Sequence, residues 1–321
     1  MTTKVLVTGG AGFIGSHIVD LYLKHGHDVA VVDNLSTGRR DNLDPRARLY
    51  QVDLLDARLA EVLDRERPQV VNHHAAQISI KVSMQDPARD AQTNILGSLR
   101  LLECCHRYGA RKVIFASSGG AIYGEPTRLP CDEEHPTRPL SPYGIAKMTF
   151  EHYLQVLASA YGMDYTVLRY GNVYGPRQDP QGEAGVVAIF TGRMLKGEPV
   201  TINGDGEQTR DYVYVGDLAR ANLLALEKGA GQAYNLASGV PTSVNQISGH
   251  LARLTGYTLA PEHGVPLSGE VRHIYLAIDK ARQGLGWQPL VGLEEGLART
   301  VAHFRESVPG QPPSTGTPRR H

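Results

Sequence analysis

The chain has 321 residues, with 33 basic and 33 acidic side chains, so no net charge favours nucleic acid or an anionic membrane as a partner. Three cysteines without paired spacing argue against a disulfide framework and predict no metal site. Because no export signal and no run of about 18 apolar residues is found, we expect a cytoplasmic protein outside the membrane.

Short β-branched segments alternate with longer amphipathic ones through the first half of the chain. Near-continuous apolar runs are typical of strands that are buried on both faces of a parallel sheet. Strands are expected at 4–9, 28–33, 48–53, 69–75, 112–118 and 164–170, and helices at 13–25, 57–66, 87–107 and 142–161. This alternation predicts a Rossmann-like, doubly wound α/β sheet.

The pattern loosens after Gly175, where a smaller and partly interleaved C-terminal lobe is expected. Its helices are predicted near 185–196, 216–228, 243–255 and 293–305. We therefore divide the chain into a main domain over 1–175, a second lobe over 176–307 and a disordered tail over 308–321, with segments near 211–238 returning to the main sheet. The tail is rich in Pro, Gly, Ser and Thr and has little to bury.

A glycine-rich turn follows the first strand. In VTGGAGFIGSH (7–17), Gly10, Gly12 and Gly15 satisfy the pattern G-x-G-x-x-G directly before the first helix. Glycine lets the backbone turn tightly and approach a pyrophosphate, which then lies at the positive end of the helix. The segment therefore predicts a dinucleotide site.

Acidic residues at strand ends indicate which dinucleotide binds. Asp33 ends the second strand, where a carboxylate accepts hydrogen bonds from the adenosine ribose and repels a 2′-phosphate. This position favours NAD over NADP, although Arg39 and Arg40 lie close enough to meet a phosphate. Asp53, at the end of the third strand, is a candidate either for contact with the adenine amino group or for the cap of the next helix.

Two adjacent histidines, His73 and His74, raise the question of a metal site. Adjacent residues on a strand point to opposite faces, so the two cannot bind one ion from there. We expect them to be packed or surface side chains with no metal bound.

The stretch SPYGIAK (141–147) places Tyr143 and Lys147 one helical turn apart. Oxidation of an alcohol by a nicotinamide needs a base for the hydroxyl proton. A phenol has an unperturbed pKa of about 10, and a nearby ammonium together with the nicotinamide favours its phenolate. Lys147 can supply that charge, and Ser117 or Ser118, at the end of the fifth strand, can hydrogen-bond the reacting oxygen.

In combination, several motifs resemble the extended short-chain dehydrogenase/reductase family, and within it the UDP-glucose 4-epimerase branch. The likeness covers about residues 3 to 305. The segments that carry it are TGGAGFIGSH, VDNLSTG, HHAAQ, FASSGGAIYGE, SPYGIAK, LRYGNVYGPRQ and TRDYVYVGDLARA. The resemblance implies NAD as cofactor, a UDP-hexose as substrate, and reversible inversion at carbon 4 through a transient 4-keto sugar.

The resemblance also implies roles for individual residues. Ser118, Tyr143 and Lys147 would form the catalytic triad, with Tyr143 as base and Lys147 lowering its pKa. Asn172 and Arg210 would contact the diphosphate of the nucleotide sugar. The NAD-binding set would comprise Gly9, Gly12, Phe13, Ile14, Gly15, Asp33, Asn34, Gly38, Asp53, Leu54, Ala75, Gln77, Tyr143, Lys147 and Tyr170.

Two features depart from the family pattern. The GGAI segment after Ser118 is one residue longer than in some epimerases, so Ser117 stays open as the catalytic serine. Leu267 stands where the family often has a phosphate-binding arginine, and Arg272, two residues past Glu270, would compensate. The identity of the substrate depends in part on this second departure.

Other functions remain as alternatives. A nucleotide-sugar 4,6-dehydratase or decarboxylase would begin with the same oxidation, but dehydratases of this type commonly carry an Asp-Glu pair where Gly119-Gly120 follow Ser118 here. Asp33 disfavours a net reductase, and the complete triad disfavours a non-catalytic NAD-binding regulator. Ile274, at the expected edge of the sugar pocket, would leave room for an N-acetyl group, so N-acetyl sugars are also candidate substrates.

Helices 87–107 and 142–161 carry apolar residues on more than one face. These residues are Leu96, Leu99, Leu102, Phe150, Leu154 and Leu157. We expect two such helices from each subunit to form the interface of a homodimer, as the resemblance also implies. The alternative is that both helices are sandwiched inside one subunit.

Overall fold

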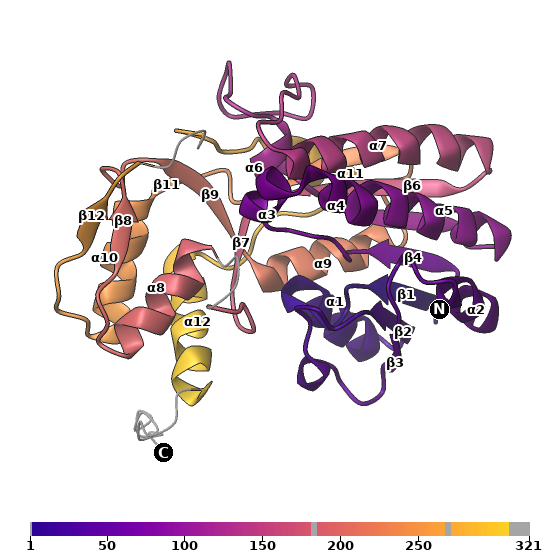
Figure 1. Ribbon diagram of the computed structural model, residues 1–321, viewed down its shortest axis with the longest axis horizontal. Coiled ribbons are helices and arrows are strands. Elements are labelled where there is room, and N and C mark those ends of the chain that lie inside the picture. Colours follow the sequence, from indigo (N-terminus) through magenta and orange to yellow (C-terminus); the bar gives the residue numbers. More distant parts are fainter. Residues whose placement is uncertain (1, 181–184, 267–270, 308–321) are drawn as a thin grey trace.

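The computed structural model describes residues 2–180, 185–266 and 271–307. Within these ranges, its larger part is a seven-stranded parallel sheet of order β10-β6-β5-β4-β1-β2-β3, which confirms the predicted fold class (Figure 1). The strands are β1 (Lys4–Thr8), β2 (Asp28–Asp33), β3 (Arg48–Gln51), β4 (Val70–His73), β5 (Lys112–Ser118), β6 (Asp164–Tyr170) and β10 (Gln232–Leu236). The strand order reverses between β1 and β4, and ligands of such sheets bind at the carboxyl ends of the strands beside this point.

Helices cover both faces of this sheet. On one face, α1 (Phe13–Lys24) and α9 (Val215–Ala225) pack together over side chains such as Val5 and Val7. On the other face, α2 (Arg58–Glu66), α5 (Ser98–Arg107) and α7 (Pro142–Ala160) cover Leu6. Alternate residues of one strand therefore enter two separate cores, which explains why the strands are apolar throughout.

The predicted helix over 87–107 consists of three consecutive pieces. They are α4 (Pro87–Ala91), a π-helical segment η2 (Gln92–Gly97) and α5. A short helix, α3 (Ile80–Gln85), precedes them and was not predicted, since six residues are too few to show a helical period. Asp86 separates the two because its side chain accepts a hydrogen bond from the backbone of Arg89 and caps α4.

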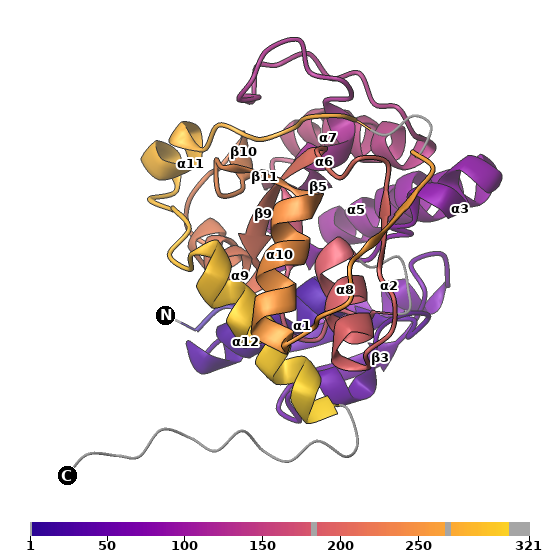
Figure 2. The ribbon, with the colours of Figure 1, turned by 90° about the vertical axis from the view of Figure 1, so that its left-hand side faces the viewer.

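The smaller lobe has its own core between short sheets and three helices. Strands β7 (Asn172–Tyr174), β9 (Thr209–Tyr214) and β11 (Pro241–Ser243) form one sheet, and β8 (Thr201–Asn203) pairs with β12 (Glu262–Gly264). Helices α8 (Val186–Leu195), α10 (Val244–Thr255) and α12 (Leu293–Ser307) pack together, as Figure 2 shows. The remaining short helices are η1 (Arg40–Asn42), α6 (Gly119–Ile122) and α11 (Asp279–Gly284).

The chain crosses between the two parts more than once. After the lobe strand β9, it returns through α9 against α1 and through β10 beside β6. The exact limits of the two domains stay a prediction, and the predicted tail over 308–321 lies outside the described residues. None of the described helices has the length and hydrophobicity that crossing a lipid bilayer requires.

Candidate active site

The glycine turn between β1 and α1 leaves no room for side chains. Gly9 has φ +67°, and a Cβ there would lie 2.7 Å from the backbone nitrogen of Ala75. A Cβ on Gly15 would overlap the carbonyl oxygen of Gly9. Helix α1 has neither a side-chain cap at Gly12 nor an acidic residue in its first turn. Its first amide groups are therefore available to an anion, as a bound pyrophosphate requires.

Asp33 is held rigidly at the end of β2. One carboxylate oxygen accepts from the backbone of Ala11 at 2.9 Å and the other from that of Leu35 at 2.8 Å. Gly38 packs so closely that its Cβ would meet the Asp33 carboxylate. Burial raises the pKa of Asp33 above its usual value, while these two hydrogen bonds oppose the shift. The carboxylate keeps free lone pairs that can accept from a ribose.

The rest of the expected adenine-side set lies around the ends of β2 and β3. Asn34 donates to one oxygen of Asp53 at 2.7 Å, and the backbone of Leu55 donates to the other at 2.9 Å. Asp53 does not cap α2, because the N-cap of that helix is Ala57, so the capping interpretation was wrong. Phe13 and Ile14 are partly buried at the start of α1, and Leu54 is in the core.

The two adjacent histidines, the last residue of β4 and the one after it, have different partners. His73 is buried and bonds the hydroxyls of Thr8 at 2.7 Å and Ser98 at 2.8 Å. His74 bonds the phenol of Tyr170 at 3.0 Å and stacks on its ring. Burial lowers the pKa of His74 to about 3, so the imidazole is neutral and orients Tyr170.

Ser118, Tyr143 and Lys147 come together at the carboxyl end of β5. Ser141 caps α7, with the Gly144 backbone donating to its hydroxyl at 3.1 Å, and this fixes the first turn that carries Tyr143. The Lys147 Nζ lies 5.8 Å from the centre of the Tyr143 ring. Burial raises the pKa of Tyr143 to about 12, and a hydrogen bond with Ser118 opposes the rise.

The neighbouring serine has a different partner. Ser117 is buried, and its hydroxyl donates to the carboxylate of Glu151. Glu151 also forms a buried ion pair with Arg169 of β6. Because successive strand residues point to opposite faces, only Ser118 meets the Tyr143 phenol. Of the two serines that the sequence left open, Ser118 has the geometry for the reaction.

Lys147 is almost fully buried beneath the expected nicotinamide site. Its Nζ donates to the carbonyl of Ala116 at 2.9 Å and lies 4.8 Å from the centre of the Phe115 ring. Burial lowers the pKa of Lys147 to about 8, while the carboxylates of Asp90 and Glu151 oppose this change. Asp90 was missed at the sequence level, although an acid on a buried helix face was a signal for it.

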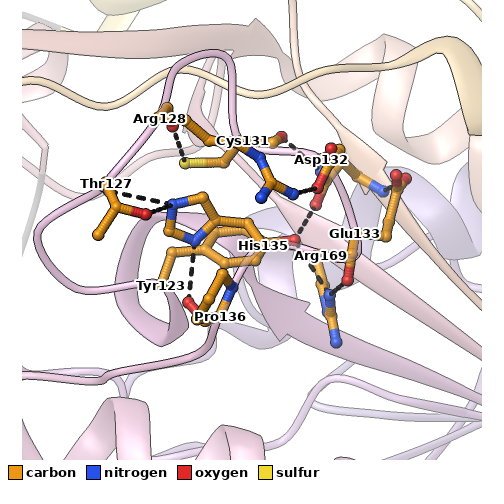
Figure 3. Close-up of polar contacts among 10 residues, drawn as sticks. Tyr123, Thr127, Arg128, Cys131, Asp132, Glu133, His135, Pro136 and Arg169 are labelled. Atoms are coloured by element: carbon orange, nitrogen blue, oxygen red, sulfur yellow. Dashed lines mark hydrogen bonds and ion pairs between the residues drawn. The ribbon is translucent and has the colours of Figure 1, made fainter.

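The loop between Ser118 and Tyr143 is fixed by its own polar contacts (Figure 3). Arg169 donates to the Tyr123 phenol at 3.0 Å and to the carbonyl of Glu133 at 3.2 Å. His135, packed edge-on against Tyr123, accepts from the backbone of Thr127 at 3.1 Å. These contacts join β6 to the loop at Tyr123 and Glu133.

The expected substrate residues lie where the smaller lobe meets the sheet edge. Asn172 begins β7, with its side chain beside Gly120. Arg210 donates to the carbonyl of Thr209 at 2.9 Å, and Arg272 forms a two-bond ion pair with Asp205 at 2.8 and 2.7 Å. Leu267, at the position where the family often has a phosphate-binding arginine, and Glu270 lie outside the described residues.

Two other residues that were expected to contact a ligand, Ile274 and Gln77, pack or form hydrogen bonds within the protein. Ile274 is in the core with only 2% of its surface exposed. The Gln77 side chain donates to Ser79 and to Asp90, and accepts from the backbone of Ser79. Neither placement tests the expected role, and both roles stay predictions.

Fold and site together define a dinucleotide-binding α/β protein with a buried Ser–Tyr–Lys group, an arrangement suited to oxidising and reducing a hydroxyl carbon. The chain belongs to the NAD dependent epimerase/dehydratase family, which it matches over residues 5–237. This confirms the resemblance seen in the sequence and the expectation of NAD as cofactor.

Several relatives are similar over nearly their whole length. A UDP-glucose 4-epimerase of Mycolicibacterium smegmatis is 44% identical over 308 residues, which cover 94% of this chain and 98% of the relative. The crystal structure of a Thermotoga maritima UDP-glucose 4-epimerase with UDP-glucose is 54% identical, covers 94% of this chain and 99% of its own, and has a TM-score of 0.93. The Thermus thermophilus UDP-glucose 4-epimerase in complex with NAD is 48% identical, covers 95% and 99%, and has a TM-score of 0.90.

Proposed function

We propose that the chain is an NAD-dependent 4-epimerase that interconverts UDP-glucose and UDP-galactose through a 4-keto sugar. The observation that carries the proposal is the buried hydrogen bond between Ser118 and Tyr143. Tyr143 lies one helical turn from Lys147, at the edge of the sheet where the glycine turn also lies. The similarity to an enzyme solved with UDP-glucose supports this choice of substrate.

Each residue has a distinct task in this reaction. When bound, NAD supplies the acceptor, and later the donor, of the hydrogen at carbon 4. The Tyr143 phenolate takes the proton of the 4-hydroxyl group and later returns it to the same oxygen, while Ser118 hydrogen-bonds that oxygen. The configuration inverts because the hydride comes back on the opposite face of carbon 4. The positive charge of Lys147 stabilises the phenolate, and its remaining N–H groups can donate hydrogen bonds to the ribose. Since both the hydroxyl proton and the hydride from carbon 4 return to the sugar, no net oxidation occurs.

The pKa shifts of Tyr143 and Lys147 support a part for the bound cofactor in making the base. In the protein alone, Lys147 has a pKa of about 8 and Tyr143 a pKa of about 12. Burial thus disfavours both charged forms, the Lys147 ammonium and the Tyr143 phenolate. A positive nicotinamide beside Tyr143 adds the missing stabilisation of the phenolate.

The test is to incubate the purified protein with UDP-galactose and NAD and to separate the nucleotide sugars. UDP-glucose should form, and Tyr143→Phe should abolish it, because the variant lacks only the acidic hydroxyl. Tyr161→Phe is the matched control, since it removes a hydroxyl from the C-terminal end of the same helix, outside both the site and the proposed dimer face. No UDP-glucose, or equal activity of Tyr143→Phe, would contradict the proposal. A product that has lost water or carbon dioxide would instead identify a dehydratase or decarboxylase.

The N-acetyl sugars are the finer question of specificity. Ile274 is smaller than an aromatic residue at the expected edge of the sugar pocket, and this supports acceptance of UDP-N-acetylglucosamine. Comparison of kcat/KM for UDP-galactose and UDP-N-acetylgalactosamine tests the idea, and Ile274→Tyr should selectively reduce the second value. An unchanged ratio of the two values in Ile274→Tyr would contradict it.

We also propose a homodimer through η2 and α7. Of the six residues first considered, Leu102, Phe150 and Leu154 are buried inside the subunit, and Leu99 and Leu157 pack against that core. Of the six, Leu96 is exposed, and it forms an exposed apolar face with Ile80, Met84, Ile145, Tyr153 and Val156. These belong to helices that pack side by side, so they offer a continuous surface for a second copy.

Light scattering at micromolar concentration tests the dimer. Val156→Lys should yield a monomer because it places a charge within the apolar face, whereas Leu290→Lys, at an equally exposed site outside that face, should not. A monomeric wild type would refute the interface.

We also propose a cytoplasmic location, since the three buried free cysteines, Cys104, Cys105 and Cys131, fit a reducing compartment.

A further inference from the structure

A buried acid with an unused oxygen lies behind the catalytic pair. Asp90, on α4, is only 1% exposed. Its Oδ1 accepts from Gln77 at 2.8 Å and from Asn94 at 3.0 Å. Its Oδ2 is equally buried and has no hydrogen-bond partner among the described residues. Such an oxygen is costly to bury, so it requires a compensating interaction.

Lys147 is the cation that acts on the Asp90 carboxylate, because burial raises the pKa of Asp90 and the charge of Lys147 opposes that rise. Helix α4 packs against α7, and Asp90 raises the pKa values of both Tyr143 and Lys147. Glu151 also raises the pKa of Lys147, but its carboxylate is already neutralised by Arg169. Asp90 has no ion pair of its own in the described part of the chain, so its charge acts mainly on the catalytic lysine.

We propose that Asp90 is a positioning residue whose carboxylate is the buried counter-charge that keeps Lys147 an ammonium when NAD is bound. The need arises from the cofactor, because its nicotinamide brings a positive charge beside a lysine that burial already disfavours as a cation. The Asp90 carboxylate offsets that charge, and hydrogen bonds from Gln77 and Asn94 hold it in place. This role depends on the proposed oxidation and reduction at Tyr143.

The other groups around Lys147 do not supply this charge. On α7 it faces Tyr143, which is neutral, and the paired Glu151. From β4 and the residue after it come His73 and His74, both of whose pKa values are lowered by burial, so they are neutral near pH 7. Arg89, which precedes Asp90 on α4, and Asp86, at the cap of that helix, are exposed to solvent.

Asp90→Asn is the informative variant. It keeps an oxygen for Gln77 and Asn94 but removes the charge, so the pKa values of Lys147 and Tyr143 should both fall. The pH profile of kcat should move to lower pH by about one unit, and activity above pH 8 should be lost first. The phenolate absorbance of the NAD complex, with Tyr143→Phe as the blank, should show the same shift without turnover.

Asp86→Asn is the matched control, because it removes an exposed carboxylate from the cap of the same helix and asparagine caps equally well. It should keep the wild-type profile. If Asp90→Asn has unshifted pH limits, or loses activity equally at every pH, the role is structural and the proposal is overturned. If that variant does not fold, a crystal structure of the wild type with NAD decides: Lys147 as the nearest cation to Asp90 Oδ2 supports the proposal, and a backbone N–H bonded to Oδ2 overturns it. An inactive wild type would refute the epimerase function, while the absorbance titration would still test Asp90.

Discussion

Replacing Glu151 with alanine should destabilise the fold far more than the loss of an exposed ion pair. The side chains of Arg169 and Glu151 are only 11% and 9% exposed, and the guanidinium donates to the carboxylate at 3.2, 3.1 and 2.6 Å. Removing one partner of a buried pair costs about 3–5 kcal/mol, because the other charge stays buried. Arg169 keeps its bonds to Tyr123 and to the carbonyl of Glu133, so we expect about 3 kcal/mol.

Urea unfolding of matched variants measures this cost. The double variant Glu151→Met with Arg169→Met should be close to wild type in stability, since no uncompensated charge remains and the volume is kept. Arg282→Ala, which breaks an exposed pair with Asp279, should change the free energy of unfolding by less than about 1 kcal/mol. A loss below about 1 kcal/mol for Glu151→Ala, or a double variant as unstable as the sum of the two single changes, would refute the reasoning.

Three further changes test other parts of the site. Asp33→Ser should improve binding of NADP relative to NAD at least tenfold, as the ratio of dissociation constants, because the charge that repels a 2′-phosphate is gone. Gly9→Ala should abolish NAD binding in calorimetry, since its Cβ would lie 2.7 Å from the Ala75 nitrogen. Lowering the pH from 7 to 5 should reduce the free energy of unfolding by about 2 kcal/mol through His74. Its folded pKa of about 3 lies below the ordinary 6.5, so the unfolded form gains a proton over this range and the folded form does not. In urea unfolding, His74→Phe should lose less stability over the same range.

Local patterns were sufficient to predict most of the architecture. The strands at 112–118 and 164–170 have the predicted bounds, because apolar runs of this length have few other ways to be buried. The short helices α3, α6 and α11 were not predicted, since four to six residues do not show a period. The π-helical segment η2 has the same apolar spacing as an α-helix at this length and was predicted as one.

The candidate site divides in the same way. Tyr143 and Lys147 could be found from sequence because their spacing lies within one helix turn. The partners of Asp90 and Arg169 could not, because each contact joins elements whose packing no local pattern specifies. Most of the exposed apolar face was missed for a related reason. A helix that is apolar on several sides does not reveal which side the sheet covers: Leu96 is exposed as expected, but Phe150 is buried and Val156 is exposed.

The two serines at the end of β5 show how one strand serves both chemistry and stability. Alternation along the strand directs Ser118 to the Tyr143 phenol and Ser117 to the Glu151–Arg169 pair on the other face. The two side chains are adjacent in sequence, so the ion pair fixes the strand end that presents the reacting hydroxyl. Ser117→Ala should therefore lower stability and affect kcat only modestly, whereas Ser118→Ala should lower kcat with little change in stability. If unfolding and kinetic measurements gave the reverse pattern, the assignment of the two serines would have to be exchanged.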